Sequence, residues 1–91
     1  MNKSELIEAL AQELNIPMRQ SGAILDTILE TIMVSLEQGD NVEIRGFGSF
    51  TVKEYKPYTG RNPKSGEQIM VRPKKLPFFK VGKELKERVD S

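Results

Sequence analysis

Residues 39–52 of the chain read GDNVEIRGFGSFTV, and within this stretch the sequence changes from a helical to an alternating hydrophobic pattern. Val42 and Ile44 alternate with polar residues, which is typical of a half-buried strand. Residues 46–48, which read GFG, predict a tight connection, and the alternation resumes over residues 49–55. The stretch therefore predicts a β-hairpin that begins where a helix ends.

The residues before this hairpin predict two helices. Asn2 and Glu5 fit a capping box at the start of a first helix over residues 2–14, which carries an apolar stripe. A second helix with a broad apolar face is predicted over residues 17–38. Gly22 is a mild flaw in it, because glycine in a helix costs up to about 1 kcal/mol relative to alanine. One short helix and a small sheet cannot cover the whole apolar face, so we expect a partner chain.

The residues after the hairpin predict an arm and a third helix. Residues 56–72 are rich in proline, glycine and basic residues, and they fit a protruding two-stranded ribbon with a turn near residues 62–66. We expect Pro73 and Pro77 to end the returning strand, and a short helix to occupy residues 83–89. Helices followed by strands and a final helix give an α+β class.

The predicted organisation is a single domain over residues 1–91. It consists of a helical base (1–40), a three-stranded antiparallel sheet with the arm (41–82) and a C-terminal helix (83–91). A domain this short buries only about 60% of the surface that its unfolded chain exposes. Because the chain has no cysteine, disulfides cannot compensate, and oligomerisation is the remaining remedy.

The composition argues against an enzyme and against a metal protein. The chain has neither cysteine nor histidine, so it lacks the thiol nucleophile, the commonest acid–base catalyst and the usual zinc ligands. It also lacks a Walker-type phosphate loop and a dinucleotide-binding fingerprint. We therefore expect no catalysis, no cofactor, no metal and no small-molecule substrate.

No apolar run approaches the roughly 20 residues of a membrane span, and the N-terminus does not resemble a signal peptide. A cytoplasmic location without a membrane partner is expected.

The formal net charge of +1 hides a strong asymmetry along the chain. Residues 1–40 hold seven acidic side chains and two basic ones, whereas residues 41–91 hold six acidic and twelve basic ones. Between Lys53 and Lys83, nine basic side chains face only two acidic ones. Such asymmetry indicates nucleic acid or a membrane surface as a partner, although a solvated lysine-rich face has the same composition.

The tip of the predicted arm reads GRNPKSG over residues 60–66. Arg61 and Lys64 lie on either side of Pro63 in this sequence. Cationic groups favour the negative potential of a narrow DNA minor groove, and a rigid apolar ring between them has the shape of a wedge for a base step. An ordinary exposed turn would use the same turn-forming residues, so the pattern alone leaves both interpretations open.

Three separated motifs resemble one known family. IRGFGSF at residues 44–50, GRNPKSG at residues 60–66 and PFFKVGKEL at residues 77–85 are similar to the signatures of the bacterial HU and integration-host-factor family, in the same order. The resemblance extends over essentially the whole chain. Val81 departs from the usual proline before Gly82, and Phe78 occupies a variable position where it is expected to be exposed.

The resemblance implies an intertwined dimer, joined through the helical base, that binds double-stranded DNA and bends it. Pro63 would insert between base pairs, with Arg61, Asn62 and Lys64 along the minor groove. The partner chain would be identical or a related alpha subunit. The implied role is that of a nucleoid protein that shapes DNA for recombination, replication and transcription.

Glu43 and Arg45 favour one branch of the family. They resemble the pair in the beta subunit of integration host factor, in which the arginine reaches the minor groove and the glutamate helps to hold it. An ordinary surface ion pair, worth about 0–1 kcal/mol, is the alternative interpretation. HU proteins often lack the pair, and an HU-type homodimer with little sequence preference remains the alternative function.

The other basic residues of interest are expected to contact phosphates, so affinity should fall by about 0.9 log unit per log unit of salt for each phosphate neutralised. These residues are Lys3, Lys53, Lys56, Arg72, Lys74, Lys75, Lys80, Lys83 and Lys86.

Two further functions fit less well. A single-stranded nucleic-acid binder needs exposed aromatic residues on a strand face, whereas Phe50 is expected to point inward with Val52. A protein-interaction module would not explain the basic arm.

Overall fold

The first helix, α1 (Lys3–Leu14), begins at the predicted capping box. In the computed structural model, which describes residues 1–91, Asn2 Oδ1 accepts a hydrogen bond from the Glu5 N–H at 2.9 Å. The Asn2 N–H donates in return to Glu5 Oε1 at 3.2 Å. Two N–H groups that no helical carbonyl can reach are thereby satisfied. Asn15 ends the helix in the left-handed conformation, at φ 54°.

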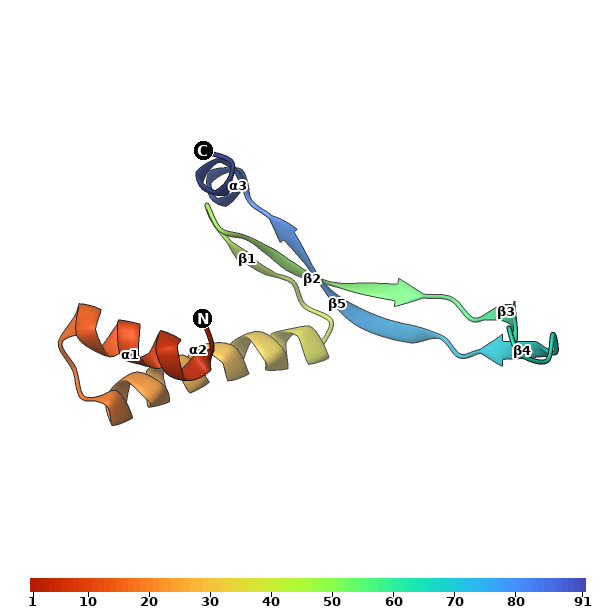
Figure 1. Ribbon diagram of the computed structural model, residues 1–91, viewed down its shortest axis with the longest axis horizontal. Helices are drawn as coiled ribbons and strands as arrows, with labels where there is room; N and C mark the ends of the chain where they lie inside the picture. The colour runs from red at the N-terminus through yellow and green to blue at the C-terminus, as the bar shows by residue number, and fades with distance from the viewer. The chain divides into compact units, whose positions relative to one another are not determined.

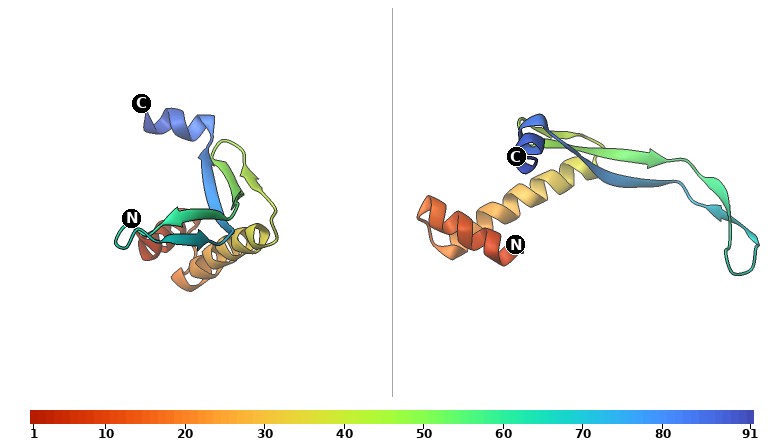
Figure 2. Two further views of the ribbon diagram at one scale, coloured as in Figure 1. Left: turned by 90° about the vertical axis from the view of Figure 1, so that its right-hand side faces the viewer. Right: turned by 45° about the horizontal axis from the view of Figure 1, so that its top comes forward.

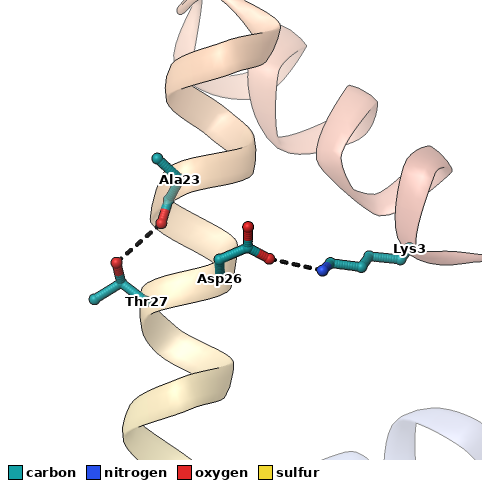
Figure 3. Close-up of polar contacts among 4 residues, drawn as sticks. All are labelled: Lys3, Ala23, Asp26 and Thr27. Carbon is teal, nitrogen blue, oxygen red and sulfur yellow. Dashed lines mark hydrogen bonds and ion pairs between the residues drawn. The ribbon is translucent and has the colours of Figure 1, made fainter.

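The second helix, α2 (Met18–Glu37), lies beside α1 (Figure 1). Ser21 is fully buried, and its hydroxyl donates a hydrogen bond to the Ile7 carbonyl at 2.7 Å. A Cβ at Gly22 would lie 3.7 Å from Ile7 Cδ1, which is an ordinary contact distance. Lys3 of α1 and Asp26 of α2 form an exposed ion pair at 2.7 Å (Figure 3). Thr27 donates to the Ala23 carbonyl at 2.9 Å in the same view.

Very little apolar surface of the single chain is removed from water. Ala11 and Leu25 are the two buried hydrophobic residues, although the chain has 91 residues. The face of α2 leaves Ile28 49% and Met33 50% exposed. A domain with so small a core is marginally stable by itself, and an exposed apolar face of this kind is typical of a protein interface.

The sheet contains three antiparallel strands in the order β1 (Val42–Ile44), β2 (Gly48–Tyr55) and β5 (Lys74–Val81). It belongs to the second of two compact units, residues 36–91, while residues 1–35 form the first. The predicted hairpin is confirmed, with Val42 opposite Phe50 and Ile44 opposite Gly48. Eight residues of β2 pair with eight of β5, so this ladder is the longest in the sheet.

The expectation that Pro73 and Pro77 end the returning strand is wrong for Pro77. Strand β5 continues through Pro77, which lies opposite Val52, and ends at Val81. Proline has no backbone N–H. In a central strand every N–H is used, because the strand has a hydrogen-bonded neighbour on each side. Pro77 is tolerated here because β5 is an edge strand of the sheet, with a partner on one side only.

The GFG connection between β1 and β2 also holds the last helix, α3 (Lys83–Val89). Gly46, at φ 85°, accepts a hydrogen bond from the Leu85 N–H at 3.1 Å, and Phe47 accepts one from the Gly82 N–H at 2.9 Å. The ring of Phe79 lies 5.3 Å from that of Phe47 and 4.9 Å from that of Phe50. The three rings contact one another, but the expectation that they form a buried core is wrong for the single chain, because Phe47 remains 44% and Phe79 37% exposed.

The predicted arm is a separate two-stranded ladder of β3 (Tyr58–Arg61) and β4 (Gln68–Val71). Figure 2 shows β2 and β5 continuing into this ladder, with the turn at its far end. The side chains of Tyr58, Ile69 and Val71 surround the space above Gly60, where a Cβ would lie 3.6–3.8 Å from each of them. The arm therefore has a small apolar cluster of its own, which the proline-rich and basic composition of residues 56–72 did not indicate.

Candidate nucleic-acid interface

The tip of the arm is a tightly hydrogen-bonded turn. The Gly66 N–H donates to the Asn62 carbonyl, and the Asn62 N–H donates to the Glu67 carbonyl, both at 2.7 Å. Asn62 Oδ1 also accepts from the Lys64 N–H at 2.9 Å. This side-chain bond fixes the backbone on both sides of Pro63, as is typical of an Asx turn. Gly66 closes the turn at φ 73°, in the left-handed region that favours glycine.

The structure places the four predicted arm-tip residues together. Pro63 and Lys64 are exposed within the turn, and Arg61 is the last residue of β3. Asn62 is half-buried, and its amide oxygen accepts a hydrogen bond within the turn, so its NH₂ group remains available as a donor. The result is a rigid, exposed ring with a guanidinium and an ammonium group close by in the chain.

Strands β2 and β5 have two chemically different faces. Residues directly opposite each other in an antiparallel pair point to the same side. One side, the phenylalanine face, carries Phe50, Phe79 and the ion pair between Glu54 and Lys75, whose Nζ and Oε1 lie 3.7 Å apart. The other side, the lysine face, carries Lys53, Tyr55, Lys74, Phe78 and Lys80.

The predicted phosphate contacts fall into three groups. Lys53, Lys74 and Lys80 lie on the lysine face, where no carboxylate is within 4.0 Å of them. Lys3, Lys75 and Lys83 form ion pairs with Asp26, Glu54 and Glu87. Lys56 and Arg72 lie between the two ladders, and Lys86 is on α3. All nine are exposed, so each is accessible to an anionic partner.

Glu43 and Arg45 are close in sequence but not joined by an ion pair. Glu43 lies in β1 opposite Ser49, whereas Arg45 lies beyond the strand, in the GFG turn. No carboxylate oxygen is within 4.0 Å of the Arg45 guanidinium. Arg45 instead lines a shallow hollow with Glu84 and Arg88 of α3. Its donors are consequently uncommitted in this structure.

Sequence reasoning missed the contacts between lysines and aromatic rings on the lysine face. Phe78 is 42% exposed, and the Lys53 ammonium lies 3.6 Å from the centre of its ring. Lys74 lies 5.7 Å from the centre of the Tyr55 ring. The exposure of Phe78 was expected, but its partner depends on the register of β5. That register could not be obtained while β5 was expected to end at its prolines.

The structure shows neither a metal site nor a membrane-spanning helix. No group of three or more acidic residues is placed to hold a metal ion. No helix is both long and apolar enough to cross a membrane.

Comparison with known proteins assigns the chain to a family. A family profile described as "Bacterial DNA-binding protein" matches residues 1–90. Integration host factor subunit beta of Haemophilus influenzae is 50% identical over 91 residues, covering 99% of this chain and 97% of that protein. DNA-binding protein HU-beta of Pseudomonas aeruginosa is 47% identical over 90 residues, covering 99% of this chain and 100% of that protein.

Solved structures agree with this assignment. A cocrystal structure of Anabaena HU with DNA has a TM-score of 0.89 at 40% identity, and covers 98% of this chain and 97% of that one. HU from Thermotoga maritima has a TM-score of 0.71 at 39% identity, with 98% of each chain covered. The chain therefore belongs to the bacterial DNA-binding family that includes HU and integration host factor.

Proposed function

We propose that this chain is an architectural protein that binds double-stranded DNA in the minor groove as a dimer and bends it. The observation that carries the proposal is the arm tip, where an exposed Pro63 is held by a hydrogen-bonded turn next to Arg61 and Lys64. The family contains DNA-binding proteins rather than enzymes, and one structural relative was crystallised with DNA. We expect no catalytic activity from this chain.

The dimer follows from the apolar face of α2. Ile28, Leu29 and Met33 are between 38% and 50% exposed, which is too much for a stable monomer of this size. A second chain would cover this face, and the partner is an identical chain or a related alpha subunit. Two such chains supply two arms, one for each side of a bend.

Pro63 acts in this proposal as a wedge. Its ring enters a base step from the minor groove, while Arg61, Asn62 and Lys64 bind along the groove beside it. Unstacking a step costs a few kcal/mol, and the bent duplex repays this by contacting more of the protein. The exposed lysines of the sheet and of α3 neutralise phosphates on the flanking DNA.

The role in the cell follows from bending. A bent duplex brings distant sites together, so the chain would serve recombination, replication and transcription complexes on the bacterial nucleoid, in the cytoplasm. We assign Arg45 and Glu43 to sequence preference, as in the beta subunit of integration host factor. The uncommitted guanidinium of Arg45 supports this, because its donors are free to read a groove.

The test of the wedge is DNA bending by Pro63→Ala, measured as energy transfer between dyes at the ends of a duplex. Wild-type protein should bind with a steep salt dependence, bend the duplex and prefer a pre-kinked duplex. Pro63→Ala should keep the salt dependence, because the charge is unchanged, but lose the bend and the preference. Pro73→Ala, at an exposed proline between the arm and the sheet, is the matched control and should bend normally. Equal bending by Pro63→Ala, or flat salt dependence of the wild type, contradicts the proposal.

Arg45→Ala separates the two branches of the family. If Arg45 gives sequence preference, its loss weakens binding to the preferred duplex sequences by about 1–3 kcal/mol, which is the usual cost of one mismatched base pair, and leaves others nearly unchanged. Arg88→Ala removes the other guanidinium of the same hollow and should affect all sequences equally. A uniform loss with Arg45→Ala would instead support HU-type binding without sequence preference.

A further inference from the structure

The contact between Lys53 and Phe78 joins two strands diagonally across the lysine face. Lys53 in β2 lies opposite Leu76 of β5, and Phe78 lies opposite Thr51, so the lysine reaches diagonally across two register positions to the next residue on the same face. Its Nζ lies 3.6 Å from the centre of the ring, well within the roughly 6 Å range of a cation–π interaction. Both side chains are exposed.

Unlike the ion pairs of the chain, this contact does not neutralise the positive charge of the lysine. Glu54 neutralises Lys75 on the phenylalanine face, and a phosphate that binds Lys75 must compete with that carboxylate. The Phe78 ring attracts an ammonium group through its quadrupole but carries no net charge. Lys53 therefore keeps its full positive charge while its position is restricted.

Restriction matters because a lysine side chain is otherwise mobile. A free lysine has roughly 2 kcal/mol of rotamer entropy, part of which is lost when its ammonium group binds a phosphate. An ammonium group already held over a ring loses less of it on binding. The lysine face offers two such groups, since Lys74 lies over Tyr55 at the longer distance of 5.7 Å.

We propose that Phe78 is a positioning residue for Lys53, and that Lys53, held above the β2–β5 ladder, binds a backbone phosphate of double-stranded DNA. The proposal rests on the proposed DNA-binding function and adds an aromatic residue that itself need not contact DNA. Phe78 thereby acts through the lysine, without the neutralisation that an acidic partner would cause.

The test is a double-mutant cycle of Lys53→Gln and Phe78→Leu in the full-length dimer, with binding to one fixed duplex measured across a salt series. Lys53→Gln should weaken binding and reduce the salt slope by about 0.9. Phe78→Leu should weaken binding about two- to fivefold in the Lys53 protein and have no effect in the Lys53→Gln protein. Phe78→Tyr keeps an aromatic ring and should bind like the wild type, and Tyr55→Leu should leave the Lys53–Phe78 coupling unchanged.

A nuclear magnetic resonance measurement checks the contact without DNA. The Lys53 ammonium lies over the Phe78 ring, so the methylene protons next to it should resonate upfield of those of other lysines. The upfield shift should disappear in Phe78→Leu and persist in Phe78→Tyr. Unchanged unfolding midpoints in these variants would confirm that the sheet is intact.

Two results would overturn the proposal. If Phe78→Leu weakens binding equally with and without Lys53, Phe78 acts on the sheet or on DNA and does not position the lysine. If Phe78→Leu leaves binding unchanged, the contact has no role in binding. In both cases wild-type bending that depends on Pro63 would leave the proposed function standing, whereas wild-type protein that binds no duplex would remove both proposals together.

Discussion

A methyl group added at Gly48 would clash with a side chain and with a backbone oxygen of the neighbouring strand. Its Cβ would lie 2.4 Å from Phe79 Cζ and 2.6 Å from the Lys80 carbonyl oxygen, and both atoms belong to the strand paired with β2. The backbone oxygen cannot move without breaking the ladder. Gly48 is thus required by the close approach of β5, at the end of the ladder that leads to α3.

Gly48→Ala should accordingly destabilise the protein by about 1–3 kcal/mol or more, as overpacking of a close contact does. The free energy of unfolding, measured with urea at a fixed protomer concentration, checks this. An unchanged urea midpoint would mean that β5 lies further from Gly48 than the structure shows.

Gly22→Ala is the contrasting substitution and should stabilise the protein by up to about 1 kcal/mol. Gly22 is helical, and its new Cβ would make only an ordinary contact with Ile7, so the helix propensity of alanine is gained without strain. The same urea titration measures the gain. A loss of stability would indicate that a partner chain packs closely against Gly22.

Among the elements, those with a strong local signal were predicted well. The capping box of α1, the GFG hairpin and the arm-tip turn each depend on residues close together in sequence, and the structure confirms them. The extent of β5 could not be obtained in this way, because a strand tolerates Pro77 only if it lies at a sheet edge. Edge position is set by the long-range order of the strands. The contacts of Lys53 and Lys74 with aromatic rings were missed for the same reason.

The arm is the element expected to be least stable. Its ladder has four residue pairs, against eight in the β2–β5 ladder, and Pro57 and Pro73 remove N–H donors between the two. Amide hydrogens of residues 58–71 should therefore exchange rapidly in free protein and slowly when duplex DNA is bound. Mass spectrometry of exchanged peptides tests this, with the β2–β5 peptides as the internal control. Slow exchange of the free arm would show that it is ordered without DNA.

For the whole molecule, the exposed face of α2 links folding to association. A chain that fully buries only Ala11 and Leu25 among its hydrophobic residues needs further apolar burial from its partner. The melting temperature should therefore rise with protomer concentration, because dissociation accompanies unfolding. Calorimetry over a wide concentration range, with sedimentation to establish the dimer, measures this. A melting temperature independent of concentration, with a sedimenting monomer, would contradict the dimer.

Pro77 in β5 also affects the tendency of the sheet to pair with strands of other molecules. An open sheet edge presents unpaired backbone groups that can recruit a strand from another molecule and start aggregation. Strand β5 is such an edge, and it carries Pro77 together with Lys74 and Lys80, neither of which is in an ion pair. A missing backbone donor and positive charges on the edge both discourage an incoming strand. Pro77, which made the extent of β5 hard to predict from the sequence, thus also discourages edge-to-edge pairing between molecules.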